Sequence, residues 1–267
     1  MEQDKRCAML DADFISKLYE SNQMIVRILS IADFNFVCHK QTSIELSRHN
    51  HQALQWLNAN TDITVYSDRD LIQQMLELFN ISAYTYYADM LRRSCDIFSQ
   101  GFYNQYYGSL DVYLTDSWNN YDLDKFIRLI DSCDTIIGTD NNLGEIKLYT
   151  MAQILELCGI EKLFIFCSDD RKARFSLSNQ TSVECVGAIA SFYLAKRYLC
   201  MPKDEAQIYF DSWMDFHSKT NGQTQFRVVS ENGRQYERIH GQDILNTIYN
   251  DGFDLLKNGF LRKKSSD

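Results

Sequence analysis

Five acidic residues lie where predicted strands and helices meet, and together they could bind a divalent cation. They are Asp11, Glu45, Glu145, Asp169 and Asp170. Asp11 follows an apolar strand expected over 6–10, and Asp169 and Asp170 follow another over 162–167. In an α/β sheet, the carboxyl ends of strands and the amino ends of helices lie at one edge, where ligands collect. Carboxylates gathered there repel each other unless a cation is bound between them.

Hydrophobic periodicity predicts the elements that position these acids. The first strand leads to a helix over about 14–31, and a second strand over 35–38 leads to a helix that reaches about residue 57. A further apolar helix over about 146–158 precedes the strand that ends at Cys167. Strands that alternate with helices in this way predict a three-layered α/β fold with a mostly parallel central sheet and helices on both faces.

The chain resembles the PIN-domain nucleases, and within them the branch with a GE…DDxxAR signature. The signature residues are Gly144-Glu145 and the run Asp-Asp-Arg-Lys-Ala-Arg over 169–174, and Asp11 and Glu45 match the earlier acids of the family. The segment 185–189 and the helix expected after it resemble the strand, glycine turn and helix that follow the signature. The resemblance therefore implies a PIN-like fold.

The resemblance covers roughly residues 6–60 and 140–215 of the chain. It implies a nuclease domain over 1–215 that carries a helical insertion over about 61–139. The insertion is rich in tyrosine and phenylalanine, and we expect one long helix from Ala83 to about Tyr107. The remaining residues, 216–267, are expected to form an appendage, with a hairpin around Asn232-Gly233 and a final helix from Gln242 to about Leu256.

Metal-dependent hydrolysis of RNA is the activity that this resemblance implies, because carboxylate oxygens are the ligands that Mg²⁺ and Mn²⁺ prefer. One or two such ions lower the pKa of a bound water, which would be the nucleophile, and neutralise the phosphodiester. Asp11, Glu145 and Asp170 would ligate the metal. Glu45 and Asp169 would be further ligands or would orient the attacking water.

Basic residues beside the proposed site are expected to compensate for the charge of the whole chain. The net charge of -9 is unfavourable for a polyanion, whose affinity comes chiefly from Lys and Arg. Arg171 and Arg174 lie within the signature and are predicted to bind substrate, although a structural salt bridge is an equal alternative for Arg174. Binding of RNA should therefore be transient.

Each acid also has a purely structural interpretation. Thr42-x-x-Glu45 and Asn142-x-x-Glu145 both fit a capping box, in which the glutamate folds back onto the first residue of a helix. Asp11 could cap the first helix, and Asp170 could cap a short helix through Phe175. The metal interpretation depends on all five acids meeting at one edge.

Two other functions remain open at this stage. Asp11-Ala12-Asp13 matches the D-x-D motif of haloacid-dehalogenase-like phosphatases, in which Asp11 would be a covalent nucleophile. A PIN-like fold could also serve as a non-catalytic interaction module, with the aromatic insertion docking a partner. The PIN resemblance itself implies service as a toxin in a toxin–antitoxin or defence setting, with a protein antitoxin or regulator and a homo-oligomer among the partners to consider.

Composition limits the class of protein. The chain has 267 residues, of which 45% are apolar, enough to bury a full core. Its eight cysteines include no C-x-x-C pair, which favours free thiols in a reducing cytoplasm over zinc sites or disulfides. No run of about 18 apolar residues predicts a membrane span.

Overall fold

The computed structural model describes residues 6–20, 34–114, 122–138, 142–162, 164–221 and 224–265. These residues belong to two compact units. The first unit consists of Met1–Ala12 and Asn35–Phe164, and the second consists of Asp13–Phe34 and Ile165–Asp267. The predicted appendage over 216–267 lies entirely within the second unit.

Five short strands form a sheet with the order β3-β2-β1-β4-β5. They are β1 (Arg6–Leu10), β2 (Phe34–His39), β3 (Ile63–Tyr66), β4 (Phe164–Cys167) and β5 (Glu184–Val186). β2 runs parallel to β3, and β4 runs parallel to β5. This is an α/β fold with a mostly parallel sheet, as the sequence predicted. The prediction that the chain is helical from about residue 61 was wrong for β3, which precedes the helical segment.

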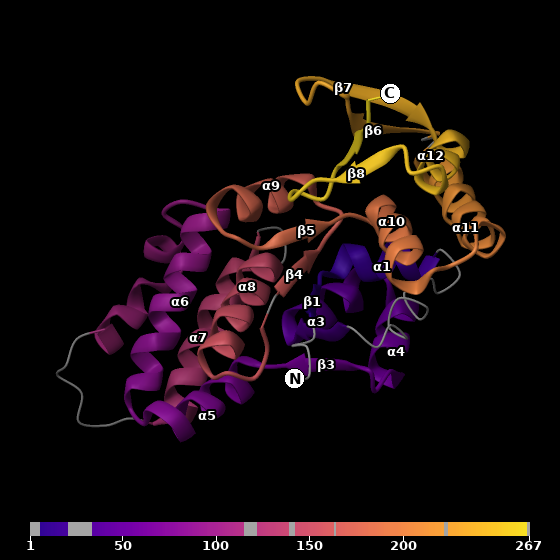
Figure 1. Ribbon diagram of the computed structural model, residues 1–267. Coiled ribbons are helices and arrows are strands. Elements are labelled where there is room, and N and C mark those ends of the chain that lie inside the picture. The colour runs from indigo at the N-terminus through magenta and orange to yellow at the C-terminus, as the bar shows by residue number, and fades with distance from the viewer. Residues whose placement is uncertain are drawn as a thin grey trace, which may run out of the picture. The chain divides into compact units, whose positions relative to one another are not determined.

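The first unit is mainly helical (Figure 1). Its helices are α3 (Lys40–His49), α4 (His51–Ala59), α5 (Asp68–Phe79), α6 (Ser82–Phe98), α7 (Leu123–Ile137) and α8 (Leu143–Leu157), with a π-helix (Tyr103–Tyr107) and a 3₁₀ helix (Gly108–Leu114) between α6 and α7. α8 is buried around most of its circumference, because it packs on β1 and against α3, α5 and α6. The apolar sequence of α8 is explained by this central position.

The helix boundaries differ from the predicted ones where polar side chains interrupt the chain. The single helix expected as far as residue 57 is two helices, because Asn50 ends α3 and its side chain caps α4 by accepting from the Ala53 N–H. The helix expected from Ala83 to Tyr107 ends at Phe98. Neither predicted capping box is present. His39 caps α3, and the Asn142 side chain donates to the Phe98 carbonyl instead.

A buried network of charged and hydroxyl groups lies in the core of the first unit. The Lys147 side chain of α8 has no exposed surface, and its Nζ lies 2.9 Å from both Asp68 Oδ2 and Asp134 Oδ2. The hydroxyl groups of Tyr87 and Tyr107 donate to Asp68 and Asp134 respectively. Burial alone would lower the pKa of Lys147, but the two carboxylates raise it well above its usual value. The network therefore ties α8 to α5 and α7 through charge as well as apolar packing.

The second unit combines helices with a second, four-stranded sheet. Its helices are α1 (Ala12–Glu20), most of which belongs to this unit, α9 (Arg171–Gln180), α10 (Ala188–Leu199), α11 (Lys203–Asn221) and α12 (Gly241–Tyr249). The sheet has the order β7-β6-β9-β8, formed by β6 (Gln225–Val229), β7 (Tyr236–His240), β8 (Phe253–Leu255) and β9 (Leu261–Lys263). The rings of Phe210 and Trp213 in α11 contact each other, and Trp213 also contacts Phe226 in β6.

The C-terminal hairpin was predicted correctly, but the end of the chain was not. β6 and β7 pair antiparallel around the predicted Asn232-Gly233 turn. The final helix, expected as far as residue 256, ends at Tyr249, and β8 and β9 follow it. Asp251 has a positive φ of 57°, a left-handed conformation that ends the helix. No helix among the residues described above is long and apolar enough to cross a membrane.

Candidate functional site

Three of the five predicted acids, Asp11, Glu45 and Glu145, belong to the first unit. Asp11 follows β1 directly, is 5% exposed, and accepts a hydrogen bond from the Ala12 N–H over 2.8 Å. Glu45 is half-buried on α3 and is 3.4 Å from the Gln41 side-chain amide, which donates to it. Glu145 is half-buried in the first turn of α8. Asp11 and Glu145 therefore lie at the start of a helix, as predicted, whereas Glu45 lies in the middle of α3, because that helix begins at Lys40 rather than near Thr42.

Gly144 brings Glu45 to the amino end of α8. A β-carbon placed on Gly144 would lie 2.6 Å from Glu45 Oε1 and 2.9 Å from Oε2, far closer than atoms can approach. A β-carbon at this position would force the flexible end of Glu45 to shift. The site also suits a negative charge, because the first N–H groups of a helix carry a partial positive charge. Glu45 therefore lies directly beside the Gly144-Glu145 pair.

Asp169 belongs to the second unit and has an ammonium partner. Its Oδ2 lies 2.5 Å from Lys17 Nζ, and its Oδ1 accepts from the Ala188 N–H over 3.1 Å. Burial alone would raise the pKa of Asp169, but Lys17, with a smaller contribution from Arg174, lowers it. Asp13 supports the arrangement, because its Oδ1 accepts from the Asp169 N–H. Both oxygens of Asp169 therefore already have positively polarised partners.

Asp170 caps a helix, the structural role that the sequence left open for it. One carboxylate oxygen accepts from the N–H groups of Lys172 and Ala173, so Asp170 is the N-cap of α9. The helix it caps is longer than expected and runs to Gln180 rather than Phe175. Asp170 therefore stabilises the segment that carries the signature arginines.

Arg171 and Arg174, the predicted substrate-binding residues, differ in exposure. Arg171 is exposed at the first position of α9. Arg174 is only 6% exposed, and its Nη1 and Nε donate to the carbonyl oxygens of Ser168 (2.7 Å) and Asn258 (3.1 Å). Arg174 thus holds the end of β4 and the loop before β9 together.

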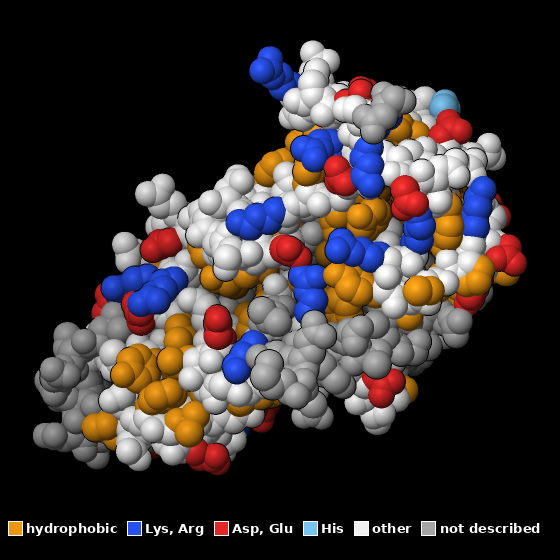
Figure 2. Space-filling view, viewed as in Figure 1, with side chains coloured by type: hydrophobic (Ala, Val, Ile, Leu, Met, Phe, Trp, Pro, Cys, Tyr) orange, Lys and Arg blue, Asp and Glu red, His pale blue; other side chains and the backbone are white. Residues whose placement is uncertain are grey.

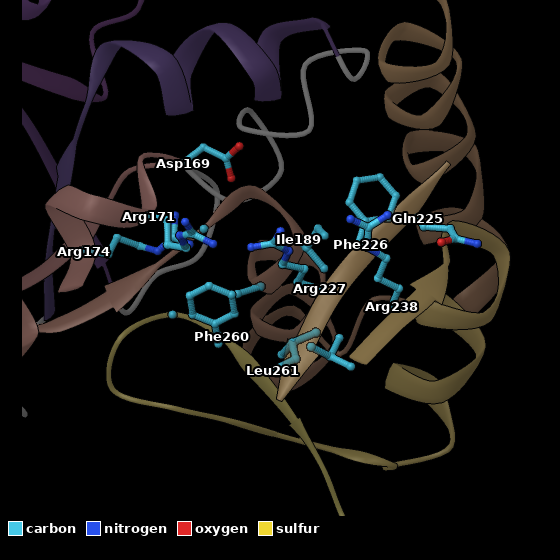
Figure 3. Close-up of a pocket in the computed structure, with 14 residues that line it drawn as sticks. Asp169, Arg171, Arg174, Ile189, Gln225, Phe226, Arg227, Arg238, Phe260 and Leu261 are labelled. Carbon is cyan, nitrogen blue, oxygen red and sulfur yellow. The ribbon is translucent and has the colours of Figure 1, made fainter. Parts of the chain in front are cut away.

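A pocket of about 580 Å³ lies beside Asp169 within the second unit. Its polar lining consists of four arginines, one carboxylate (Asp169) and one amide (Gln225). The arginines are Arg171, Arg174, Arg227 and Arg238. Figure 3 shows that Asp169, Arg171 and Arg174 form one side of the pocket and that Arg227, Phe226 and Arg238 come from the hairpin opposite. The pocket is thus strongly cationic in a chain that is acidic overall.

The five acids differ in how well they fit a divalent cation. Asp11, Glu45 and Glu145 offer hard oxygen donors suited to Mg²⁺ or Mn²⁺. Asp169 fits less well, because a metal would have to displace the Lys17 ammonium. Across the described ranges, no group of three or more His, Cys, Asp or Glu side chains is arranged to hold a metal ion. The convergence of all five acids on one ion stays a prediction.

Sequence reasoning missed three basic residues near these acids. Lys17 pairs with Asp169 across 152 positions of the chain, and its only sequence signal is its spacing of four residues from Asp13. Arg227 and Arg238 lie on the predicted hairpin, where alternation could have placed them on one face. Their position beside Arg171 depends on tertiary packing and has no sequence signal.

Comparison with known proteins gives no relative for this chain. No family model, no curated protein and no solved structure matches it. The function of the chain must therefore be inferred from its own residues.

Proposed function

We propose that the chain is a nuclease that hydrolyses RNA phosphodiester bonds with Mg²⁺ or Mn²⁺. The observation that carries the proposal is the contact between the Glu45 carboxylate and Gly144, next to Glu145. The carboxylate of Glu45, far from Glu145 in sequence, lies against Gly144 at the start of α8, where the missing β-carbon leaves space for it. A catalytic role for the pair would explain why a glycine precedes Glu145 at this position.

The first unit would supply the cation ligands in this proposal. Asp11, Glu45 and Glu145 would hold the ion through carboxylate oxygens. A bound divalent cation supplies an activated water and neutralises charge on the phosphate. In the second unit, Asp169 is paired with Lys17 and Asp170 caps α9.

The resemblance to PIN-domain nucleases supports the same activity. It rests on Gly144-Glu145 and the 169–174 run, and the α/β fold with its mostly parallel sheet is compatible with it. The resemblance also motivates a biological role as a toxin, with an antitoxin or regulator as protein partner. That role and any homo-oligomer belong to the proposal, and expression of the chain in bacteria with and without the Glu145→Gln change would test the toxicity.

Cleavage of end-labelled RNA tests the activity directly. Single-stranded and hairpin RNA are incubated with Mg²⁺, Mn²⁺ or EDTA, and products are separated on denaturing gels. The native chain should cleave only with a divalent ion, and Glu145→Gln and Asp11→Asn should each reduce the rate by at least about a hundredfold, the loss of roughly 3 kcal/mol of transition-state stabilisation. Glu77→Gln is the matched control, because Glu77 is exposed on α5 in the same unit.

Two results would replace the proposal with one of its rivals. Turnover of a small phosphomonoester, abolished by Asp11→Asn and not by Glu145→Gln, would identify a phosphatase with Asp11 as nucleophile. Metal binding without hydrolysis of any phosphate ester would identify an interaction module.

A further inference from the structure

Two arginines of the second sheet lie directly opposite each other on paired strands. Arg227 of β6 and Arg238 of β7 are register partners in the antiparallel hairpin. Side chains at opposite positions project from the same face of a sheet, and like charges there are destabilising. Both residues are exposed, and both line the pocket beside Asp169. The fold thus holds two positive charges together on the pocket side of the hairpin.

Other basic residues of the same sheet have acidic partners. Arg262 pairs with Asp254 over 3.1 Å, and Lys263 pairs with Glu237 over 2.6 Å. Among the residues that the structure describes, Arg227 and Arg238 make no ion pair. The contrast lies within one sheet, so a general shortage of acids does not explain it. An anion in the pocket would supply the missing partner.

The remaining lining adds positive charge and apolar surface. Arg171 is exposed at the pocket wall, and the Arg174 guanidinium lies 5.5 Å from the centre of the Phe260 ring. Asp169 is paired mainly with Lys17 and interacts more weakly with Arg174. Figure 2 shows Lys and Arg side chains bordering apolar surface in the area of α9, α10 and the second sheet. Ile189 and Leu261 belong to this apolar part of the lining.

We propose that this pocket binds the sugar–phosphate backbone of single-stranded RNA, as the substrate of the nuclease proposed above, on which the inference rests. Guanidinium groups bind phosphate through bidentate hydrogen bonds, which ammonium groups cannot form. The basic residues that line the pocket are all arginines. Arginines on two opposite walls suit consecutive phosphates of a strand, and the apolar floor suits the faces of sugars and bases. Arg227 and Arg238 are therefore substrate-binding residues supplied by the C-terminal hairpin.

Binding is measured separately from cleavage. Fluorescence anisotropy of a short, fluorescein-labelled single-stranded RNA is recorded in EDTA at several salt concentrations. Arg227→Gln and Arg238→Gln should each weaken binding about tenfold, as expected for one charge-assisted hydrogen-bonded contact. Each should also reduce the salt slope by about 1. Arg234→Gln is the control, because Arg234 lies in the turn of the same hairpin and outside the pocket.

The outcomes separate this inference from the proposed function. Equal RNA affinity of the native chain and the Arg227→Gln/Arg238→Gln double variant would overturn the inference even if the chain cleaves RNA. An equal loss of RNA affinity in Arg234→Gln would also overturn it, because the loss would then reflect the net charge of the protein rather than contacts in the pocket. Binding of adenosine monophosphate in place of RNA, with the same arginine dependence, would overturn it in favour of a small-nucleotide site. Arginine-dependent RNA binding without cleavage under any metal condition supports the inference and refutes the nuclease.

Discussion

Positive charge is used in opposite ways in the two units of this protein. In the first unit, Lys147 is fully buried and contacts two carboxylates, Asp68 and Asp134. In the second unit, Arg227 and Arg238 are exposed, face each other across a hairpin and have no acidic partner among the described residues. The first arrangement satisfies every charge internally, and the second leaves charge available at a pocket.

This difference distinguishes a structural charge from a functional one. A buried ion must be paired, because its desolvation is not otherwise compensated, so Lys147 stabilises the packing of α5, α7 and α8. An exposed arginine remains hydrated, so two arginines without an acidic partner lower the stability of the fold only slightly. They remain available to bind a ligand. The Lys17–Asp169 pair is intermediate, because both side chains are about one quarter exposed, at 28% and 25%. The comparison predicts that the loss of stability on mutation is largest for Lys147, smaller for Lys17 and smallest for the two arginines.

Removal of the Lys147 charge should have the largest effect on stability. Lys147→Met leaves Asp68 and Asp134 buried without a cation, which should lower the free energy of unfolding by about 3–5 kcal/mol. Urea denaturation followed by circular dichroism measures the change. Lys203→Met is the control, because Lys203 is exposed at the start of α11 and should change stability by less than about 0.5 kcal/mol. Similar stability of the two variants would show that the buried network is dispensable.

Gly144→Ala should separate activity from folding. The added methyl group meets the flexible end of Glu45, which can move away, and alanine favours the helix by roughly 0.5–1 kcal/mol over glycine. Stability should therefore change little, while RNA cleavage should fall about a hundredfold because the carboxylate is displaced. Gly108→Ala is the matched control, since a β-carbon there meets no atom within 4 Å. Full cleavage activity in Gly144→Ala would remove the main support for the site.

Loss of the Lys17–Asp169 pair should have a smaller, pH-dependent effect. Lys17→Met should lower the free energy of unfolding by about 1–2 kcal/mol at pH 7, the value of a partly buried charged hydrogen bond. Burial would raise the pKa of Asp169 but Lys17 outweighs it, so the folded pKa lies below the unfolded value of about 4. The contribution is therefore present above that pH and is lost as the pH falls through the folded value.

Unfolding curves at pH 7 and pH 3 test this dependence. The difference between the native chain and Lys17→Met should shrink at the lower pH. Lys172→Met, a change of an exposed lysine on α9, should show no such trend. A difference that is constant with pH would mean that Lys17 acts through packing alone.

The sequence predicted those parts of the fold that depend on local pattern. The apolar runs of β1, β2 and β4 and the Asn232-Gly233 turn were found from neighbouring residues alone. β3 was missed because a run of four residues is short, although all of its residue types favour strands. β8 and β9 have three residues each and pair with each other, and only β9 pairs with β6, so they depend on tertiary contacts rather than on their own composition.

The candidate site was predicted in part for the same reason. Acids at strand and helix junctions are visible in sequence, because an element boundary is a local feature. The ammonium partner of Asp169 was not visible, because Lys17 comes from α1, far away in the chain. The opposition of Arg227 and Arg238 depends on strand register, which the hairpin turn fixes but which residue types alone do not reveal.

The pocket arginines should contribute least to folding, and they should respond to anions. Arg227→Gln or Arg238→Gln relieves a like-charge contact, so the free energy of unfolding should stay within about 0.5 kcal/mol of the native value or rise slightly. Inorganic pyrophosphate should raise the melting temperature of the native chain by binding the folded state. The double variant should lose this shift, whereas Arg234→Gln should keep it, and the shift should weaken as NaCl is added. If either single change lowered the free energy of unfolding by several kcal/mol, these arginines would be structural charges like Lys147.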